Sequence, residues 1–205
     1  MSIARYRVRY FGDLLQLPWE PSGQIEARAL REVALPMPDE VLEQFCLDHG
    51  RNEDFQSQYR HLDLHRLKWT CHEVSGETLV TATVFPRFAP WVASVSRRAV
   101  RISEEGWSAA DRRVAIAEHW RVSRTWIRPP ILIARKAVRH GPQPLHLVEG
   151  HTRLGLLGGL IGTGWISPSA THRAWIGEMP SRSSKQYISD PANCSSEKKR
   201  LRNRR

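Results

Sequence analysis

The residues best suited to chemistry lie where an apolar strand runs into a helix. The run Leu145–Glu149 is followed by Gly150, His151, Thr152 and Arg153. In the first turn of a helix the backbone N–H groups have no intrahelical partner, and the helix dipole favours negative charge there. Gly150 allows a ligand to approach closely, while Arg153 can bind two phosphate oxygens at once. Thr152 offers a hydroxyl and His151 an imidazole, so this spacing predicts a phosphate-binding turn.

The turn matches neither the GxxxxGK[ST] nor the GxGxxG phosphate motif. Four elements are expected to position it. A rigid Arg-Pro-Pro segment precedes Ile131–Ala134, which predicts a buried strand, and Leu145–Glu149 predicts a second one. Beyond the turn, the apolar spacing over 154–161 predicts a short, closely packed helix that Gly162 ends. Ala174–Ile176 predicts the last strand of the fold.

The chain before residue 126 carries weaker local signals. Alternating or β-branched apolar residues and proline boundaries predict strands, and apolar residues at helical spacing predict amphipathic helices. The polar stretch 51–72 has no clean period, and no element is assigned to it. The expected elements are strands at Tyr6–Phe11, Thr78–Phe85 and Trp91–Val95, a helix over 39–49, and a helix over 108–122 with Ser108 as its N-cap.

Three segments resemble, in this order, the core of the ParB/sulfiredoxin superfamily: RPPILIA, PLHLVEGHTRLGLLGGL and AWIGE. The hallmark of that superfamily is a strand, an acid-Gly-x-x-Arg turn and a helix, which Glu149–Arg153 matches. The resemblance covers Arg128–Glu178, and the expected helix after Pro36 is similar to the one that opens that fold. It implies an α/β (α+β) fold with a small mixed sheet flanked by helices, as a single domain over 1–179 with an insertion around 51–125.

Members of this superfamily use the turn to bind nucleotide phosphates, and they act as CTP-dependent DNA clamps, sulfinic-acid reductases, serine kinases or nucleases. The resemblance implies phosphate or nucleotide binding by Gly150, Thr152 and Arg153, beside the imidazole of His151. It makes Glu149 and His151 the candidates for catalytic proton transfer or Mg²⁺ contact. The alternatives are that Glu149 caps the helix and that His151 is a surface residue.

Two departures from the superfamily pattern narrow the activity. Sulfiredoxin-like enzymes carry a catalytic Cys directly after the Gly of the turn, where this chain has His151, so sulfinic-acid reduction is not expected. Partition-protein members usually have an Arg-Arg pair in place of Thr152-Arg153, and a long helical DNA-binding region follows. Little sequence remains after Glu178 for such a region, so a sliding clamp is not expected either.

The net charge is +10, and half of the excess lies in the last nine residues, which hold six basic side chains and one acidic side chain. The segment 180–205 is rich in Ser, Asn and Pro and predicts a basic disordered tail. Such a tail either adds salt-dependent attraction to DNA or RNA or only keeps the protein in solution. Arginines interleaved with Trp over 97–126 are a second candidate nucleic-acid surface, although a mixed surface over buried Trp is favoured.

Cys46, Cys71 and Cys194 are odd in number and form no CxxC pair, so a disulfide framework is not expected. There is no apolar run of a secretory signal and none long enough to span a bilayer. We therefore expect a cytoplasmic protein without a membrane partner. His61 and His65 could share a helix face and bind zinc, but no HExxH or CxxC accompanies them, so no metal site is assigned.

These residues and the resemblance predict a nucleotide- or phosphate-binding protein. Its expected ligand is ATP or CTP with Mg²⁺, hydrolysed or used for phosphoryl transfer through positioning and charge neutralisation. The alternative is a nucleic-acid-binding regulator or a ParB-like nuclease without nucleotide turnover. The sequence leaves open whether the chain is an enzyme and what its oligomeric state is.

Overall fold

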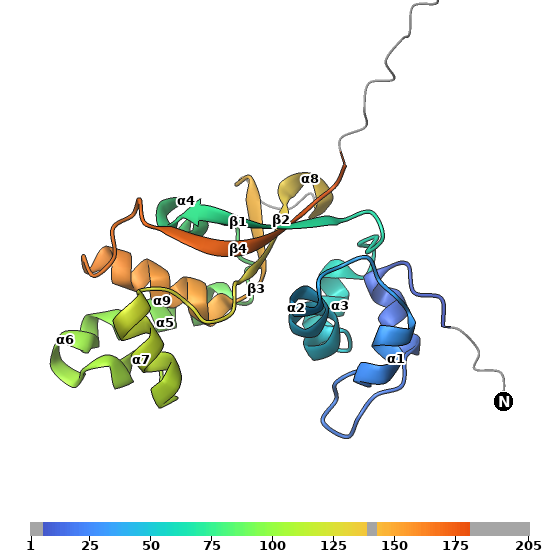
Figure 1. Ribbon diagram of the computed structural model, residues 1–205, viewed down its shortest axis with the longest axis horizontal. Coiled ribbons are helices and arrows are strands. Elements are labelled where there is room, and N and C mark those ends of the chain that lie inside the picture. The colour runs from blue at the N-terminus through green and yellow to red at the C-terminus, as the bar shows by residue number, and fades with distance from the viewer. Residues whose placement is uncertain (1–5, 139–142, 181–205) are drawn as a thin grey trace, which may run out of the picture.

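A four-stranded mixed sheet forms the centre of the fold (Figure 1). The computed structural model describes residues 6–138 and 143–180. Across the sheet the strand order is β1-β4-β2-β3; β4 is antiparallel to β1 and parallel to β2, and β2 is antiparallel to β3. The expected mixed α/β class is confirmed. The strands are β1 (Lys68–Ser75), β2 (Ile131–Ala134), β3 (Leu145–Glu149) and β4 (Thr171–Glu178).

Short helices cover this sheet, and several of them are single turns. α2 and η2 form one continuous helical run that extends to His49, as the sequence predicts. The helices are η1 (Phe11–Gln16), α1 (Ala27–Glu32), α2 (Asp39–Val41), η2 (Leu42–Leu47), α3 (Glu53–Tyr59), α4 (Gly76–Val80), α5 (Ala89–Ser96), η3 (Arg97–Arg101), α6 (Ile102–Glu105), η4 (Trp107–Ala109), α7 (Val114–Ser123), α8 (Arg135–Val138) and α9 (His151–Gly162).

The strands nearest the turn lie where the sequence predicts them. β2 and β3 have the expected bounds, and the first three residues of β2 are completely buried. β4 contains the expected Ala174–Ile176 but is longer, because all eight of its residues pair with β1. The helix expected over 154–161 is α9, which begins three residues earlier.

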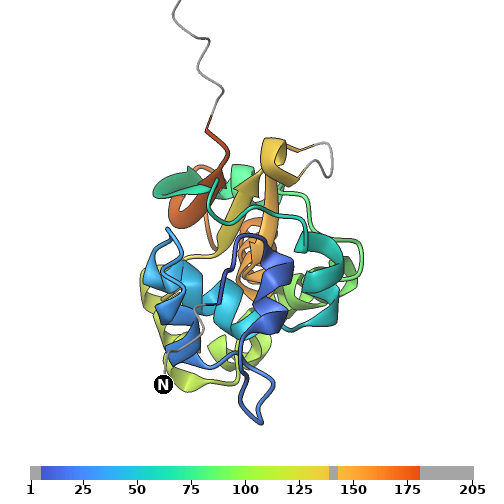
Figure 2. The same cartoon turned by 90° about the vertical axis from the view of Figure 1, so that its right-hand side faces the viewer.

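β2 separates two hydrophobic cores because its side chains alternate between the faces of the sheet. Ile131 and Ile133 pack into a core with the N-terminal helices α1 to α3, whereas Leu132 packs into a second core with residues of α5, α7 and α9. In Figure 1 the two groups of helices lie on opposite sides of the view, and in Figure 2 the N-terminal group stands in front of β2 and β3. The site described below lies between them.

The glycines of α9 allow α5 to pack against it at backbone distance. A Cβ at Gly155 would lie 2.6 Å from the carbonyl oxygen of Val92, and one at Gly159 would meet the backbone of Ser96. Glycine inside a helix costs about 1 kcal/mol relative to Ala. Close packing of α5 against α9 offsets that cost and brings α5 beside the start of α9 (Figure 1).

The strand expected at Thr78–Phe85 is wrong. Its first residues belong to α4, whose N-cap Ser75 accepts a hydrogen bond from the N–H of Thr78. Of the rest, Thr83 alone pairs with a strand, through one bridge to His146. β-branched residues favour strands only weakly, and the cap together with packing against α9 outweighs that preference here.

Two further expected strands are also wrong. Trp91–Val95 lies inside α5, where Pro90 occupies the first turn and its missing N–H is not needed. Tyr6–Phe11 alternates like a strand, but only Tyr10 forms a bridge, to Asp63, before η1 begins. Pro90 thus marks the start of an element correctly, but that element is a helix.

The helix expected over 108–122 begins later, at α7. Ser108 lies in η4, and Asp111 accepts a hydrogen bond from the N–H of Arg113 just before α7 starts. His61 and His65 are not on a helix, and Nε2 of His65 bonds the carbonyl of Val8, which removes the basis of the zinc hypothesis. The basic tail expected over 180–205 lies, apart from its first residue, outside the described residues.

Candidate functional site

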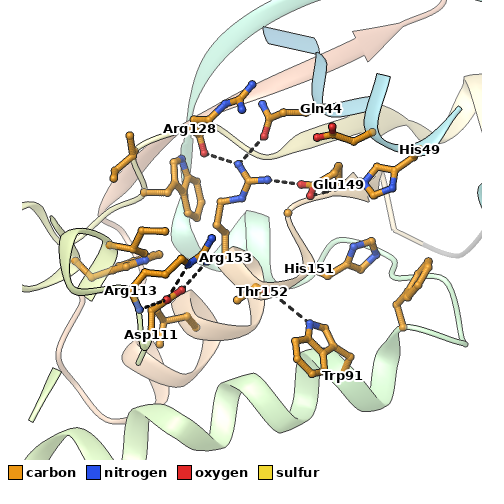
Figure 3. Close-up of a pocket in the computed structure, with 18 of the residues that line it drawn as sticks. Gln44, His49, Trp91, Asp111, Arg113, Arg128, Glu149, His151, Thr152 and Arg153 are labelled. Carbon is orange, nitrogen blue, oxygen red and sulfur yellow. Dashed lines mark hydrogen bonds and ion pairs between the residues drawn. The ribbon is translucent and has the colours of Figure 1, made fainter. Parts of the chain in front are cut away.

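A pocket of about 700 Å³ opens at the first turn of α9, between the two groups of helices (Figure 3). The predicted turn residues Glu149 to Arg153 all line it. Its other walls come from the end of the η2 helix, from α5 and α7, and from the loop before β2. The structure therefore brings the five predicted site residues together with residues from far along the chain.

Gly150 has the backbone conformation that the turn requires. Its φ is +105°, in a region that side chains other than glycine rarely adopt, and a Cβ here would lie 2.6 Å from Cβ of Pro130. Within the described residues, no side chain caps α9. The first-turn N–H groups of α9 are thus left for a ligand, at the positive end of a twelve-residue helix.

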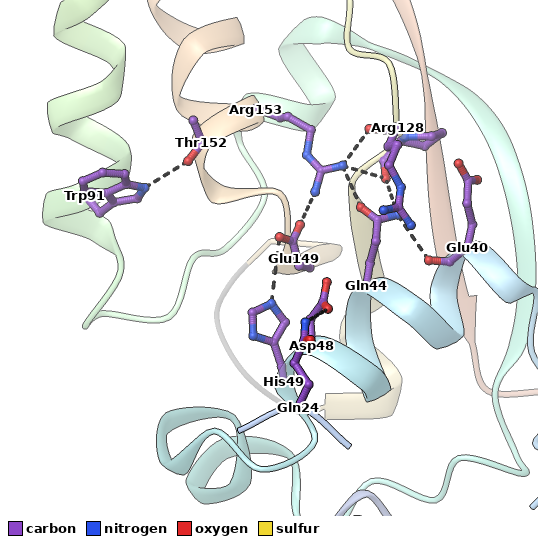
Figure 4. Close-up of polar contacts among 11 residues, drawn as sticks. Gln24, Glu40, Gln44, Asp48, His49, Trp91, Arg128, Glu149, Thr152 and Arg153 are labelled. Carbon is purple, nitrogen blue, oxygen red and sulfur yellow. Dashed lines mark hydrogen bonds and ion pairs between the residues drawn. The ribbon is translucent and has the colours of Figure 1, made fainter. Parts of the chain in front are cut away.

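Arg153 joins three segments of the chain (Figure 4). Its Nη1 donates to Oε1 of Gln44 at 2.8 Å and to the carbonyl of Arg128 at 2.7 Å, and its Nη2 forms an ion pair with Glu149. Arg153 is predicted to bind phosphate, but both of its terminal nitrogens are already bound to protein acceptors. In this arrangement Arg153 positions the turn and adds positive charge beside it.

Glu149 is held as a carboxylate. Burial disfavours its charged form, but His49, whose Nε2 lies 3.9 Å from Oε1, and the charge of Arg153 outweigh burial and lower the pKa of Glu149. His49 in turn stacks on Phe55 with a centroid separation of 4.0 Å. Glu149 can accept hydrogen bonds or a proton at neutral pH, but it is not protonated there and so cannot act as a general acid.

His151 is neutral at physiological pH. Burial lowers its pKa to about 4 and outweighs the opposing effect of the Glu149 carboxylate, while the guanidinium of Arg153 acts in the same direction as burial. Its ring packs 4.4 Å from that of Phe88, and its Nε2 is buried without a hydrogen-bond partner among the described residues. A buried, unpaired ring nitrogen costs free energy, which a ligand that bonds to it would recover.

Thr152 and Trp91 connect α9 to α5. The indole N–H of Trp91 donates to the Thr152 hydroxyl at 3.2 Å, and the Trp91 side chain remains 48% exposed. The hydroxyl proton of Thr152 is still available to a ligand, because that oxygen acts only as the acceptor in this bond. Figure 3 shows the pair at the edge of the pocket.

The floor of the pocket is apolar. Trp120 and Trp126 are almost completely buried and pack edge to face at 6.0 Å, while Ile116, Ile127 and Leu156 add aliphatic surface. A ligand with a flat organic part as well as an anionic group matches such a pocket.

The charged side chains around the pocket largely cancel one another. The guanidinium of each arginine that lines it has a carboxylate partner, as the ion pairs Arg113–Asp111 at 2.8 Å, Arg128–Glu43 at 2.9 Å and Arg153–Glu149 show. The attraction for an anion at this point comes mainly from the N–H groups of the α9 turn.

Sequence reasoning missed three residues of the site: Gln44, His49 and Arg128. Gln44 is polar but only 4% exposed, and it lies on the helix expected over 39–49, which the apolar residues of one face predict. His49 is part of that face by spacing, yet it contacts Glu149. A polar residue on the buried face of an amphipathic helix was the available signal.

No family model matches this chain, and no curated protein or solved structure does either. Within 6–138 and 143–180, there is no group of three or more His, Cys, Asp or Glu side chains that could hold a metal ion. Over the same ranges no helix is both long enough and apolar enough to cross a membrane.

Proposed function

We propose that this protein binds a nucleotide or a similar phosphate ligand, with a phosphate group at the first turn of α9. The single observation that carries the proposal is the uncapped turn, held open by Gly150 at φ +105°, at the mouth of a 700 Å³ pocket. The unpaired Nε2 of His151 and the hydroxyl of Thr152 lie beside that turn. The apolar floor formed by Trp120 and Trp126 suits the base.

We also propose that the fold is of the ParB/sulfiredoxin type. The order β2, β3, glycine turn, α9 and β4 supports this, since it is the order on which the resemblance rests. The segment 51–125, expected as an insertion, supplies β1 and helices α3 to α7, and α5 and α7 line the pocket. The insertion would then contribute one wall of the ligand site.

Each residue of the turn has a distinct proposed role. Gly150 and the backbone N–H groups bind phosphate oxygens, and Thr152 and neutral His151 donate or accept one hydrogen bond each. Arg153 contributes charge and holds Glu149 and Gln44 in place. Glu149, predicted as catalytic, is proposed to orient the turn and to accept a proton from an attacking water.

ATP or CTP with Mg²⁺ remains the proposed form of the ligand. Mg²⁺ is usually held by substrate phosphates and only one or two carboxylates. The carboxylates that line the pocket are Asp48, Asp111 and Glu149, and Asp111 is paired with Arg113. Glu149 is already engaged by Arg153, and Asp48 accepts a hydrogen bond from Gln24. The ion would therefore arrive with the ligand.

Titration calorimetry of the full chain with ATP, CTP and GTP, each with Mg²⁺, tests the proposal. We expect saturable binding of at least one nucleotide and a loss of affinity of about tenfold in His151→Leu, which corresponds to one lost hydrogen bond to a charged group. His72→Gln, an exposed position on β1, is the control that should leave the affinity unchanged. Release of inorganic phosphate in the same samples separates binding from turnover.

Two results would overturn the proposal. One is the absence of binding by a folded chain at millimolar concentrations of all three nucleotides. The other is binding that His151→Leu and His72→Gln affect equally, because the ligand would then lie elsewhere.

A further inference from the structure

A second cavity, of about 610 Å³, adjoins the pocket at the first turn of α9, which we call the first pocket, beyond Thr152 and Trp91. Both cavities are lined by Trp91, Thr152, Asp111 and Arg113, so they share a wall. We call the second cavity the arginine pocket. The arginines that line it are Arg98, Arg101, Arg112 and Arg113.

The arginine pocket has an excess of positive charge that the first pocket lacks. Its lining holds four guanidinium groups and two carboxylates, Glu105 and Asp111. Arg101 pairs with Glu105 at 3.3 Å and Arg113 with Asp111 at 2.8 Å. In the described part of the chain no carboxylate lies within ion-pair distance of Arg98 or Arg112, so these two charges are available to an anionic partner.

Trp91 stands between the two pockets in a fixed orientation. Its indole N–H bonds Thr152, and the guanidinium of Arg98 lies 5.2 Å from its ring centroid. Nearly half of the side chain is nevertheless exposed to solvent. An exposed indole that is held in place beside arginines is the arrangement on which unpaired bases stack in proteins that bind single strands.

We propose that the ligand path continues from the α9 turn past Trp91 into the arginine pocket, and that it takes a single-stranded oligonucleotide. This inference rests on the proposed function, because the first phosphate of the strand occupies the same turn. One base stacks on Trp91, and the following backbone phosphates meet Arg98 and Arg112. A mononucleotide leaves the second pocket unfilled, and a duplex keeps its bases paired inside, where Trp91 cannot stack on them.

An acidic peptide could also meet the arginines, but it offers nothing for the exposed indole or for the apolar floor of the first pocket. The basic tail expected over 180–205 cannot cause a difference between variants. Its contribution to nucleic-acid binding is sequence-independent and is the same for every variant of the folded part. The test therefore compares variants of the full chain that differ only in where charge is removed.

The experiment measures binding of a fluorescein-labelled single-stranded DNA of about ten nucleotides, a length within the usual site size, by anisotropy over a range of salt concentrations. The test variant is Arg98→Gln/Arg112→Gln. The matched control is Arg28→Gln/Arg31→Gln on α1, which removes the same charge on the opposite side of the view in Figure 1. Thermal unfolding confirms that both variants are folded.

We expect the test variant to lose at least tenfold in affinity for the strand. The negative slope of log K against log salt should become shallower by about 1.4, which is about 0.7 for each lost phosphate contact. The control should stay within a factor of two of the native protein. Calorimetric binding of the mononucleotide should be unchanged in the test variant, since Arg98 and Arg112 do not line the first pocket.

Four outcomes would overturn the inference. Equal losses in the test and control variants would mean that total charge alone attracts the strand. Tighter binding of a duplex or of poly-glutamate than of the single strand would identify a different partner. If the native chain binds the mononucleotide but binds the oligonucleotide no more tightly, the inference is rejected and the proposed function stands. If the native chain binds neither, both are rejected.

Discussion

Gln44 accepts a 2.8 Å hydrogen bond from Nη1 of Arg153, a residue 109 positions further along the chain. The bond links the π-helical segment η2 to the first turn of α9. Nε2 of Gln44 also donates to the carbonyl of Pro129 at 3.4 Å, so the same side chain contacts the loop before β2. A side chain of η2, about a hundred residues earlier in the chain, therefore helps to fix the position of the α9 turn.

Removing the guanidinium of Arg153 should destabilise the fold. Arg153→Ala leaves Glu149, whose side chain is 24% exposed, without its guanidinium partner. It also leaves Gln44 Oε1 and the carbonyl of Arg128 without a donor. We expect the free energy of unfolding to fall by about 2–3 kcal/mol, less than for a fully buried pair. Urea denaturation measures this, with Arg31→Ala as the exposed control. A change of the same size in both variants would show that Arg153 has no structural role.

Gly150 should tolerate no side chain. Gly150→Ala places a Cβ at φ +105° and 2.6 Å from Pro130, and we expect a loss of at least about 2 kcal/mol. Gly162→Ala, at the end of the same helix with no atom within 4 Å of the added Cβ, should leave stability unchanged or raise it by up to about 1 kcal/mol. Chemical denaturation of the two variants side by side tests the contrast, and equal losses would contradict it.

The neutral state of His151 should make stability depend on pH. Its pKa is about 4 in the folded state and near 6.5 when exposed, so between these values the unfolded chain binds more protons. Stability due to this group is complete above pH 6.5 and falls as the pH decreases to 4, by at most about 3 kcal/mol.

His151→Gln removes this titration. The difference in unfolding free energy between the native protein and the variant should therefore shrink by that amount from pH 7 to pH 4. A difference that stays constant over this range would mean that His151 is solvated in the folded protein.

The bond between Thr152 and Trp91 can be tested separately from ligand binding. Thr152→Val removes the acceptor at 3.2 Å, whereas Thr152→Ser keeps it. We expect a loss of about 1 kcal/mol or less in stability for Val and a faster exchange of the Trp91 indole proton in NMR spectra. Serine should restore slow exchange. If valine leaves the exchange rate unchanged, the indole is not held by Thr152.

The part of the fold that could be predicted is the part whose signals are local. β2 and β3 are apolar runs with clear boundaries, and the glycine between Glu149 and His151 marks the turn. β1 could not be found, because KWTCHEVS mixes charged and apolar residues and forms a strand only by pairing with β4. The helical α4 replaces an expected strand for the same kind of reason, since its cap and its contacts with α9 outweigh its composition.

The candidate site also has a part that local sequence predicts and a part that depends on packing between distant segments. Glu149 to Arg153 are consecutive, so their proximity follows from the chain itself. Gln44, His49 and Arg128 reach the turn only through the packing of η2 and the loop before β2, which no spacing rule encodes. That Arg153 is already bound to protein acceptors also depends on those distant residues.

Because Gly155 and Gly159 have no side chains, they set the short distance between α5 and α9. Trp91 is on α5 and the proposed phosphate-binding turn begins α9, so the spacing of these helices sets the separation of the two ends of the proposed ligand path. Alanine at Gly159 would push α5 outward and carry Trp91 away from Thr152. The width of the proposed ligand path is thus set by two glycines that line neither pocket.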